Sequence, residues 1–327
     1  PRHLRPNADR LPWAEQVRYW GSEPMAGGVE RRAITMHGEG VERRWVSLRR
    51  NGFTDPGDVT DRPVEERSRT TWSLTWALPR DASAHRTAQR TGVVHAPTPT
   101  DEPLGLPGLL IASFPLDPSR RHVAPGPATD ALVAQAGQAY ADLVAGLVAD
   151  EAAAVAEDAA DSAGTAWRLG DLVATGLPSG ALDGAVQASA VSALRRAAVL
   201  RPAEGGPPVR PRDAVALAAP AGADEELVAA LAPSVAGLVH APRASAAALE
   251  ILGVHRMTLS DVIDQLPLGR TPGQWRELYG AVAGQAADPL QREALAALPV
   301  PLADGRVVRG VRGVVLAEPG DPLGDLS

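Results

Sequence analysis

Two adjacent arginines at the end of an apolar run are the side chains of this sequence best suited to chemistry. Arg120 and Arg121 closely follow the run at 109–116, and Ser119 and His122 flank them. A guanidinium offers a planar fork of N–H donors that matches phosphate oxygens. A well-placed arginine is worth about 10³–10⁵ in the rate of phosphoryl transfer, and a rigid element supplies the positioning that such chemistry needs. This turn is therefore a candidate phosphate site.

A local ion pair is the alternative explanation for these two arginines. Either Arg120 or Arg121 could pair with a nearby carboxylate, such as that of Asp117 or Asp130. The residues by themselves favour this alternative, because most exposed arginines pair locally or are solvated.

Three further arginine pairs lie on segments that we expect to be strands. They are Arg31 and Arg32, Arg43 and Arg44, and Arg49 and Arg50. Adjacent strand residues point to opposite faces, so one arginine of each pair faces outward. We interpret most of them as solvated edge charges, which also discourage strands from aggregating. A nucleic-acid stripe is the other interpretation. Residues 126–327 oppose it, because they carry 24 acidic residues against 14 arginines.

Other common catalytic and metal patterns are absent from the sequence. Without cysteine there is no disulfide and no thiolate ligand, and without lysine there is no Walker A loop. No Gly-x-Ser-x-Gly elbow occurs, and Ser179 reads as a turn residue. None of the seven histidines stands at ligand spacing from a second histidine and a carboxylate, so we expect no metal site.

Composition places the chain among globular proteins of about two domains. Its 327 residues are rich in Ala, Gly and Pro, as in proteins from GC-rich bacterial genomes. The formal net charge of -7 is uneven, because residues 1–125 carry 18 arginines and 15 acidic residues. We find no uninterrupted apolar stretch of about 18 residues and no signal peptide. We therefore expect a cytoplasmic protein that has no membrane partner and no nucleic-acid partner.

The first part of the chain is predicted to form strands. Val29–Met36 and Val41–Arg49 flank a hairpin-like turn, and Thr70–Leu78 alternates apolar and polar residues with period two. Val93–His95 and Leu109–Leu116 are short apolar runs that we interpret as buried strands, with a helix as the alternative for the second. We expect irregular structure or loops at 1–28, 51–69 and 80–90.

The second part is predicted to be mostly helical. Thr129 is a suitable N-cap for a long helix that continues toward Ala160. Further helices are expected at Leu182–Leu200, around Leu259–Leu266, and after the capping box that begins at Thr271. The Asp304-Gly305 pair predicts a final hairpin.

These patterns give the expected fold class and domains. An α/β (α+β) N-terminal segment with a mixed sheet precedes a mostly helical region with short strands. The expected segments are 1–125, an α/β middle segment; 126–205, a helical segment; and 206–327, a helical and α+β segment that ends in the hairpin. The Gly/Pro-rich stretch at 204–211 is the candidate linker.

Three stretches resemble sacsin-like proteins of the heat-shock-ninety-type (GHKL) ATPase group. They are Pro97–His122, with its apolar-Pro-Leu-Asp turn before the arginines; Thr271–Val282, with Trp275-Arg276-Glu277-Leu278-Tyr279; and Leu298–Arg306. In that group a similar turn carries an arginine that reaches the terminal phosphate of ATP held by a neighbouring domain. One departure stands out, since the usual Asn of the turn is Asp117 here, and a carboxylate there could hold Arg120 away from phosphate.

The resemblance implies a chaperone-like middle region of an ATP-dependent protein. Arg120, and second to it Arg121, would be the catalytic side chains; Ser119, Arg120 and His122 would face the nucleotide. The group's Glu-x-x-x-Asn helix is missing, because Glu157–Asp161 contains no asparagine. The chain alone is thus expected to bind no cofactor and to hold at most part of an ATPase site. ATP with Mg would belong to an N-terminal nucleotide-binding domain of the full-length protein.

A second function class stays open beside this one. The chain could be a non-catalytic protein–protein interaction or dimerisation module, with a protein client or a homodimer as its assembly. Its surface would then include the stripe of Trp275 and Tyr279, although ordinary core packing is the favoured interpretation of that stripe.

Overall fold

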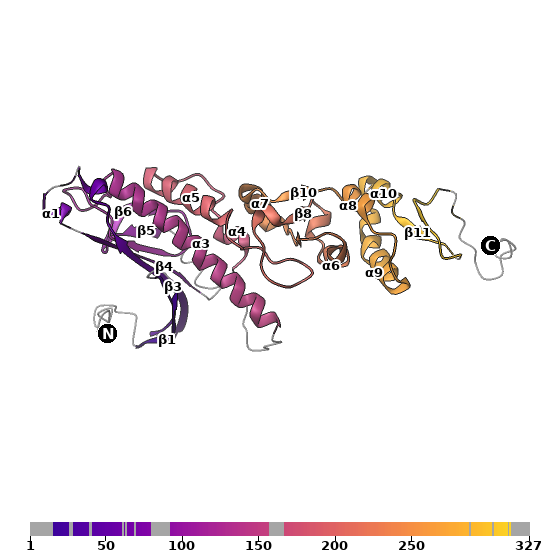
Figure 1. Ribbon diagram of the computed structural model, residues 1–327, viewed down its shortest axis with the longest axis horizontal. Coiled ribbons are helices and arrows are strands. Elements are labelled where there is room, and N and C mark those ends of the chain that lie inside the picture. The colour runs from indigo at the N-terminus through magenta and orange to yellow at the C-terminus, as the bar shows by residue number, and fades with distance from the viewer. Residues whose placement is uncertain are drawn as a thin grey trace. The chain divides into compact units, whose positions relative to one another are not determined.

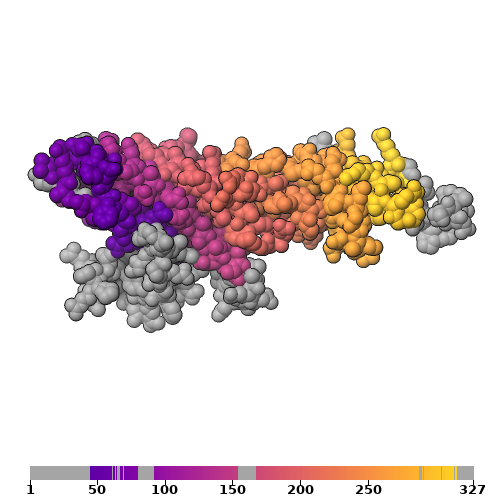
Figure 2. Space-filling model, in the orientation of Figure 1, coloured from indigo at the N-terminus to yellow at the C-terminus, as the bar shows by residue number. Residues whose placement is uncertain are grey.

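A computed structural model describes residues 16–25, 29–38, 41–60, 62, 64–68, 70–79, 92–156, 167–287, 289–302, 304–312 and 314; side chains are described from Trp45 onward, except at 65, 66, 154–156, 287 and 290. The other residues are grey in Figures 1 and 2. The chain divides into two compact units. Unit 1 comprises the described residues of Pro1–Val199 together with Ala247–Gly253, and unit 2 comprises those of Leu200–Ala246 and Val254–Ser327.

Unit 1 is built on a seven-stranded sheet in the order β1-β2-β3-β4-β7-β5-β6. The strands are β1 (Gln16–Met25), β2 (Val29–Gly38), β3 (Val41–Phe53), β4 (Thr71–Pro79), β5 (Gly92–His95), β6 (Pro99–Leu104) and β7 (Leu109–Ala112). Neighbours are antiparallel except for β5 and β7, which are parallel. The expected mixed sheet is therefore confirmed.

Unit 1 also contains helices among its described residues. They are η2 (Pro56–Val59), α1 (Val64–Arg67), α3 (Pro127–Ala156), α4 (Leu169–Leu172), α5 (Ala181–Leu194) and most of α7 (Ala246–Leu252). The long α3 lies along the sheet and α5 packs against α3 (Figure 1). The predicted helical spacing is confirmed, because the apolar positions of α3 are buried. They are Leu132, Ala136, Tyr140, Leu143 and Leu147.

The core of unit 1 joins β4 to α3 through polar atoms as well as apolar ones. Trp76 of β4 is fully buried, and its Nε1 donates to the Ala136 carbonyl at 2.9 Å. Its ring lies 4.9 Å from that of Tyr140, whose hydroxyl donates to the Leu172 carbonyl at 2.7 Å. Burial raises the pKa of Tyr140, so this phenol stays a neutral donor. Every buried polar group in this contact thus has a partner.

Two small residues let α3 and α5 approach closely. A Cβ added at Gly137 of α3 would lie 2.1 Å from Ser189 Oγ and 2.5 Å from the Ser189 backbone carbon. Glycine is therefore required at this crossing in spite of its low helix propensity. Among the described residues, α3 is also the one helix long and apolar enough to cross a membrane. Of its most apolar 18-residue stretch, however, 56% is buried inside the fold. Burial of this kind is typical of a core helix.

A buried carboxylate ties α5 to the sheet. Asp183 has no exposed surface and accepts hydrogen bonds from Gly105 N at 2.7 Å, Ser179 N at 2.8 Å and Gln187 Nε2 at 2.9 Å. The first donor belongs to the turn between β6 and β7, and the second precedes α5. One side chain thus satisfies backbone donors from two elements.

Unit 2 contains three short parallel strands in the order β10-β8-β9 and a final hairpin of β11 and β12. Its strands are β8 (Val215–Leu217), β9 (Leu238–Val239), β10 (His255–Met257), β11 (Pro299–Pro301) and β12 (Val307–Arg309), and its helices are η3 (Pro211–Asp213), η4 (Ala221–Ala223), α6 (Glu225–Leu231), η5 (Ala232–Ser234), η6 (Arg243–Ser245), α8 (Leu259–Gln265), α9 (Pro272–Ala283), η7 (Gly284–Ala287) and α10 (Pro289–Leu295). The predicted capping box is confirmed, because Thr271 accepts from Gln274 N and Gln274 accepts from Thr271 N. The helical region with short strands is confirmed as well.

Several expected boundaries differ from the structure. β1 occupies much of the stretch expected to be irregular, and a register shift between Trp20 and Ser22 explains why no regular alternation marks it. β7 ends at Ala112 rather than at Leu116. The helix α3 begins at Pro127, so Thr129 is not its N-cap. The hydroxyl of Thr129 donates instead to the Ala124 carbonyl at 2.6 Å.

The units also fall differently along the chain from the three expected segments. The helices at 127–156 and 181–194 pack in the same compact unit as the sheet. The division at Leu200 lies close to the Gly/Pro-rich stretch at 204–211. The expected loop at 80–90 lies outside the described residues.

Candidate functional site

The two candidate arginines lie on a tight hairpin-like loop beyond the end of β7. Leu116 and Val123 form an isolated antiparallel bridge at its base. Asp117 N donates to the His122 carbonyl at 3.0 Å, and Arg120 N donates to the Asp117 carbonyl at 2.9 Å. Pro118 and Ser119 thus occupy the centre of a β-turn, where proline in the first central position is favoured.

Arg120 has a left-handed backbone, with φ of 59°. In hairpins of this kind the residue after the turn is usually glycine, since a Cβ is disfavoured there. A non-glycine residue in this conformation costs roughly 1–2 kcal/mol. Strained residues that persist cluster at functional sites, so the presence of arginine here is informative.

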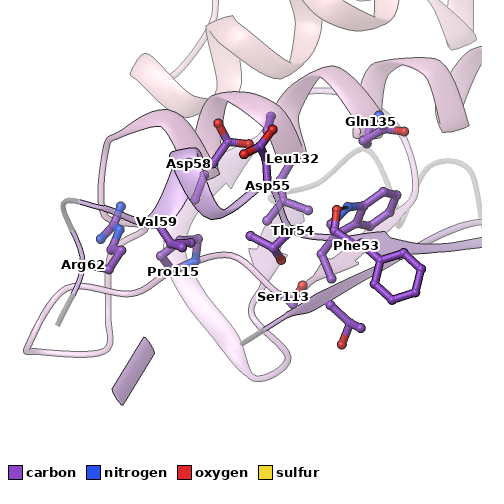
Figure 3. A pocket seen from close by; sticks show the side chains of 14 residues that line it. Phe53, Thr54, Asp55, Asp58, Val59, Arg62, Ser113, Pro115, Leu132 and Gln135 are labelled. Atoms are coloured by element: carbon purple, nitrogen blue, oxygen red, sulfur yellow. Dashed lines mark hydrogen bonds between the residues drawn. The ribbon is translucent and has the colours of Figure 1, made fainter. Parts of the chain in front are cut away.

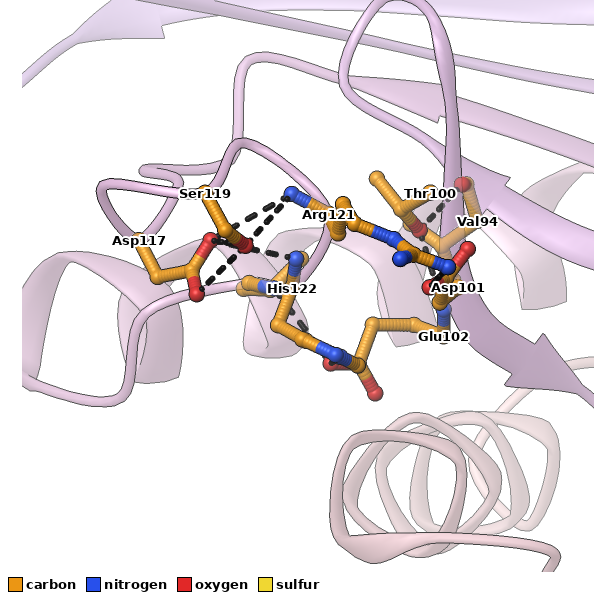
Figure 4. Close-up of polar contacts among 9 residues, drawn as sticks. Val94, Thr100, Asp101, Glu102, Asp117, Ser119, Arg121 and His122 are labelled. Atoms are coloured by element: carbon orange, nitrogen blue, oxygen red, sulfur yellow. Dashed lines mark hydrogen bonds and ion pairs between the residues drawn. The ribbon is translucent and has the colours of Figure 1, made fainter.

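The Asp117 carboxylate holds the loop in shape. Its oxygens accept from Ser119 Oγ at 2.8 Å and from the backbone N–H groups of Arg121 and His122, each at 3.3 Å (Figure 4). The hydrogen bond from Ser119, followed by those from the two backbone donors, lowers the pKa of Asp117. Asp117 therefore acts as a local cap. Asp117, which stands where the resembled turn has Asn, directs its oxygens to the Ser119 hydroxyl and to the loop backbone.

Arg121 and His122 both reach the neighbouring edge strand β6. The Arg121 guanidinium pairs with Asp101 at 2.6 Å, and His122 Nδ1 lies 3.2 Å from Glu102 Oε1 (Figure 4). Asp101 N also donates to the Arg121 carbonyl at 2.8 Å. These contacts attach the loop to the sheet. The alternative of a local ion pair is thus correct for Arg121, although its partner is neither of the two carboxylates considered.

Arg120 differs from its neighbours. Its side chain is exposed, and it forms no ion pair or side-chain hydrogen bond with any residue that the structure describes. The four candidate side chains therefore differ: Ser119 is bound to Asp117, Arg121 to Asp101 and His122 to Glu102, while Arg120 alone among them presents an open guanidinium. A cation on a fixed loop is the arrangement that can meet an anion from outside.

The turn fits one phosphate group rather than a whole nucleotide. Four side chains were expected to face a ligand, and three of them are bound within the fold. Arg120 could donate two parallel hydrogen bonds to phosphate oxygens. The adenine, the ribose and the metal would need donors and acceptors from elsewhere. The stretch 157–161, the poor match to the nucleotide helix, lies outside the described residues.

The other arginine pairs can be followed only at 49–50, because the described side chains begin at Trp45. Arg49 donates to Asn51 Oδ1 at the surface, at 3.3 Å. Arg50 instead reaches α3, where it pairs with Asp142 and donates to Gln135 Oε1. This pair thus sends one arginine outward, as predicted, while period-two geometry directs Arg50 onto the helix-covered face, where it is not a solvated edge charge.

A cavity that the sequence did not indicate lies beside the same loop. It measures about 220 Å³ and is lined by residues from the end of β3, from η2, from the start of β4 and from the first turns of α3 (Figure 3). Its walls include Phe53, Asp55, Asp58, Trp72 and Leu132. The sequence signal was weak: an aromatic residue followed by an Asp-Pro-Gly-Asp turn reads as an ordinary loop.

Comparison with known proteins assigns no role to this site. No protein-family model, no curated protein and no solved structure matches this chain.

Proposed function

We propose that this chain is a chaperone-like middle region of an ATP-dependent, cytoplasmic protein. It supplies Arg120 as a phosphate-sensing side chain to a nucleotide domain outside the chain, and other surfaces of it bind a client or partner. The observation that carries the proposal is the contrast at one loop. The backbone and three side chains are fixed by hydrogen bonds and ion pairs, while the Arg120 guanidinium is exposed and unpaired among the described residues.

The strained backbone of Arg120 supports this role. A glycine would remove the strain, so retaining an arginine favours a use for the guanidinium. The fixed backbone of the loop lowers the entropy cost of positioning the residue, and the side chain itself is ordered when it meets the phosphate. ATP with Mg would be held by the other domain, and the chain by itself would bind neither.

The test is ATP turnover by the full-length polypeptide that carries this chain. Arg120→Ala should lower turnover by about 10³-fold or more if the guanidinium stabilises the transferring phosphate. Arg276→Ala is the matched control, because Arg276 of α9 is also exposed and has no ion pair in the described part of the chain. Equal turnover by the Arg120 variant and the control would refute the catalytic role.

A non-catalytic interaction module is the second candidate, and one observation favours it. Phe53 is 86% exposed and stands at the mouth of the cavity. The stripe of Trp275 and Tyr279, by contrast, is not a free surface. Trp275 is buried in the core of unit 2, and the Tyr279 hydroxyl donates to the Pro299 carbonyl. A partner surface would therefore lie elsewhere, and among the described residues the cavity beside Phe53 is a candidate.

A further inference from the structure

We infer that the cavity at the start of α3 receives an arginine side chain from a basic segment of a partner protein. The inference does not depend on the role proposed for Arg120. It rests on the shape, the charge and the aromatic rim of the cavity, each of which favours a long cationic side chain.

Shape comes first. Small-molecule sites usually measure about 300–1,000 Å³, and this cavity is smaller, at about 220 Å³. Its inner wall is apolar and buried, formed by Val59, Ala128 and Leu132. A narrow pocket with an apolar wall fits one long side chain, whose methylene stem can pack against that wall.

Charge selects the head group. Asp55 and Asp58 line the cavity from one short turn and lie close to Leu132 in Figure 3. Asp55 accepts a hydrogen bond from Gly57 N at 2.8 Å, and neither carboxylate forms an ion pair with another residue that the structure describes. Two carboxylates without a partner cation attract a cation and repel an acidic or phosphorylated segment.

The cation already in the wall is engaged by the backbone. Arg62 is only 8% exposed, and its terminal Nη2 donates to the carbonyls of Ala124 and Pro125 at 3.2 and 2.8 Å. Those bonds close the base of the Arg120 loop. Arg62 therefore serves the fold and keeps its charge in the wall, so the lining holds one cation beside the two carboxylates, which form no ion pair with it.

The aromatic rim distinguishes arginine from a simple ammonium group. The Phe53 ring projects into solvent on the opposite side of Figure 3 from Arg62. Trp72 lies across Gly52, where an added Cβ would come within 2.4 Å of the indole, and its Nε1 donates to the Phe53 carbonyl at 3.2 Å. This packing holds the indole in place. A planar guanidinium stacks on aromatic faces better than an ammonium does.

The experiment uses the Trp72 indole N–H as its reporter. The whole chain is titrated with the capped peptide Gly-Ser-Arg-Ser-Gly and with versions that carry norleucine or glutamate in place of the arginine. The chemical shift of the indole N–H is followed by nuclear magnetic resonance at each step. The arginine peptide should shift it saturably, with a Kd on the order of 1 mM. The other two peptides should bind at least about tenfold more weakly, since they lack a cation for the carboxylates.

Variants test the assigned groups. Asp58→Asn and Phe53→Ala should each raise the Kd about two- to fivefold, the amount expected from one partly exposed ion pair or cation–π contact. Leu177→Ala is the control, because Leu177 is a fully solvated apolar residue that does not line the cavity. It should leave the Kd unchanged. The hydrogen bond of the reporter is to the backbone of residue 53, so a folded Phe53→Ala variant keeps its indole signal.

Three results would overturn the inference. Equal binding of the norleucine peptide would make the cavity an apolar site. The absence of a saturable shift with the arginine peptide would show that the cavity does not take this side chain. An unchanged Kd in both the Asp58 and the Phe53 variants would place the binding elsewhere on the chain.

Discussion

Replacing Arg120 by glycine should make the protein more stable, although it removes the proposed functional group. The residue has a φ of 59°, and its exposed side chain forms no ion pair or hydrogen bond with the described part of the fold that glycine would lose. Relief of the left-handed strain gains roughly 1–2 kcal/mol. The larger conformational freedom of glycine in the unfolded chain takes back about 0.5–1 kcal/mol. The expected net gain is about 0.5–1 kcal/mol.

Arg120→Ala separates the two effects, since it removes the guanidinium but keeps the Cβ. Alanine retains the strain, so the free energy of unfolding should stay within about 0.5 kcal/mol of the wild type, as for most exposed substitutions. Unfolding of unit 1 would be measured by scanning calorimetry. The glycine variant should raise its midpoint by about 1–4 °C, the range expected for a unit of this size.

Two outcomes would refute this reasoning. If both variants lost more than about 1 kcal/mol, the guanidinium would be part of a folded contact rather than an open group. If glycine gained nothing over alanine, the loop would not hold a left-handed residue in solution. When stability rises as expected, the glycine and alanine variants should be equally defective in ATP turnover of the full-length protein, because both lack the side chain.

Four other substitutions test particular contacts of the fold. Gly137→Ala should destabilise unit 1 by about 1–3 kcal/mol, because the overpacking against α5 outweighs the gain in helix propensity. Gly280 has open space around it, so Gly280→Ala should instead stabilise α9 by about 0.5–1 kcal/mol. Denaturant unfolding of both variants checks the opposite signs. Asp183→Ala should lower the free energy of unfolding by about 2–4 kcal/mol in the same assay, because two backbone donors lose their acceptor. A loss below about 0.5 kcal/mol would contradict the role of Asp183 in tying α5 to the sheet. The pKa of Asp117 is lowered, so its contribution to loop order is complete above the ordinary aspartate range and is lost as pH falls through the lowered pKa. The protection factors of the Arg121 and His122 amides, taken relative to the intrinsic exchange rate at each pH, should therefore fall in acid in the wild type, and Asp117→Ala should show the lower protection at neutral pH as well.

The sequence predicted those parts of the fold in which one local pattern decided the outcome. Period-two alternation located β4, and the spacing of apolar residues located the buried face of α3. Capping chemistry located α9, and the Asp-Gly pair located the final hairpin. In each case the local preference and the tertiary fold agree, which is why the pattern was sufficient.

The sequence was less informative where long-range contacts decide. β1 carries a glycine, a proline and an irregular register, and only pairing with β2 makes it a strand. Arg50 looked like a surface charge, but its partners Asp142 and Gln135 stand about ninety positions later in the chain. The same limit applies to Arg121, whose acidic partner comes from the neighbouring strand β6. Sequence spacing alone could not tell Arg121, which is paired, from Arg120, which is open.

One short segment connects the two proposed sites. The segment 115–125 begins with Pro115 in the cavity wall, passes through the Arg120 loop, and returns to carbonyls that Arg62 holds from the cavity side. Its two ends are joined, because Ala124 N donates to the Pro115 carbonyl at 2.9 Å. A side chain that enters the cavity therefore presses on the base of the loop that presents Arg120. If both proposals hold, the arginine peptide should slow hydrogen exchange at the loop amides, and Asp58→Asn should weaken that effect together with binding. Binding that left the loop amides unchanged would show that the two sites act independently, even though they share these backbone bonds.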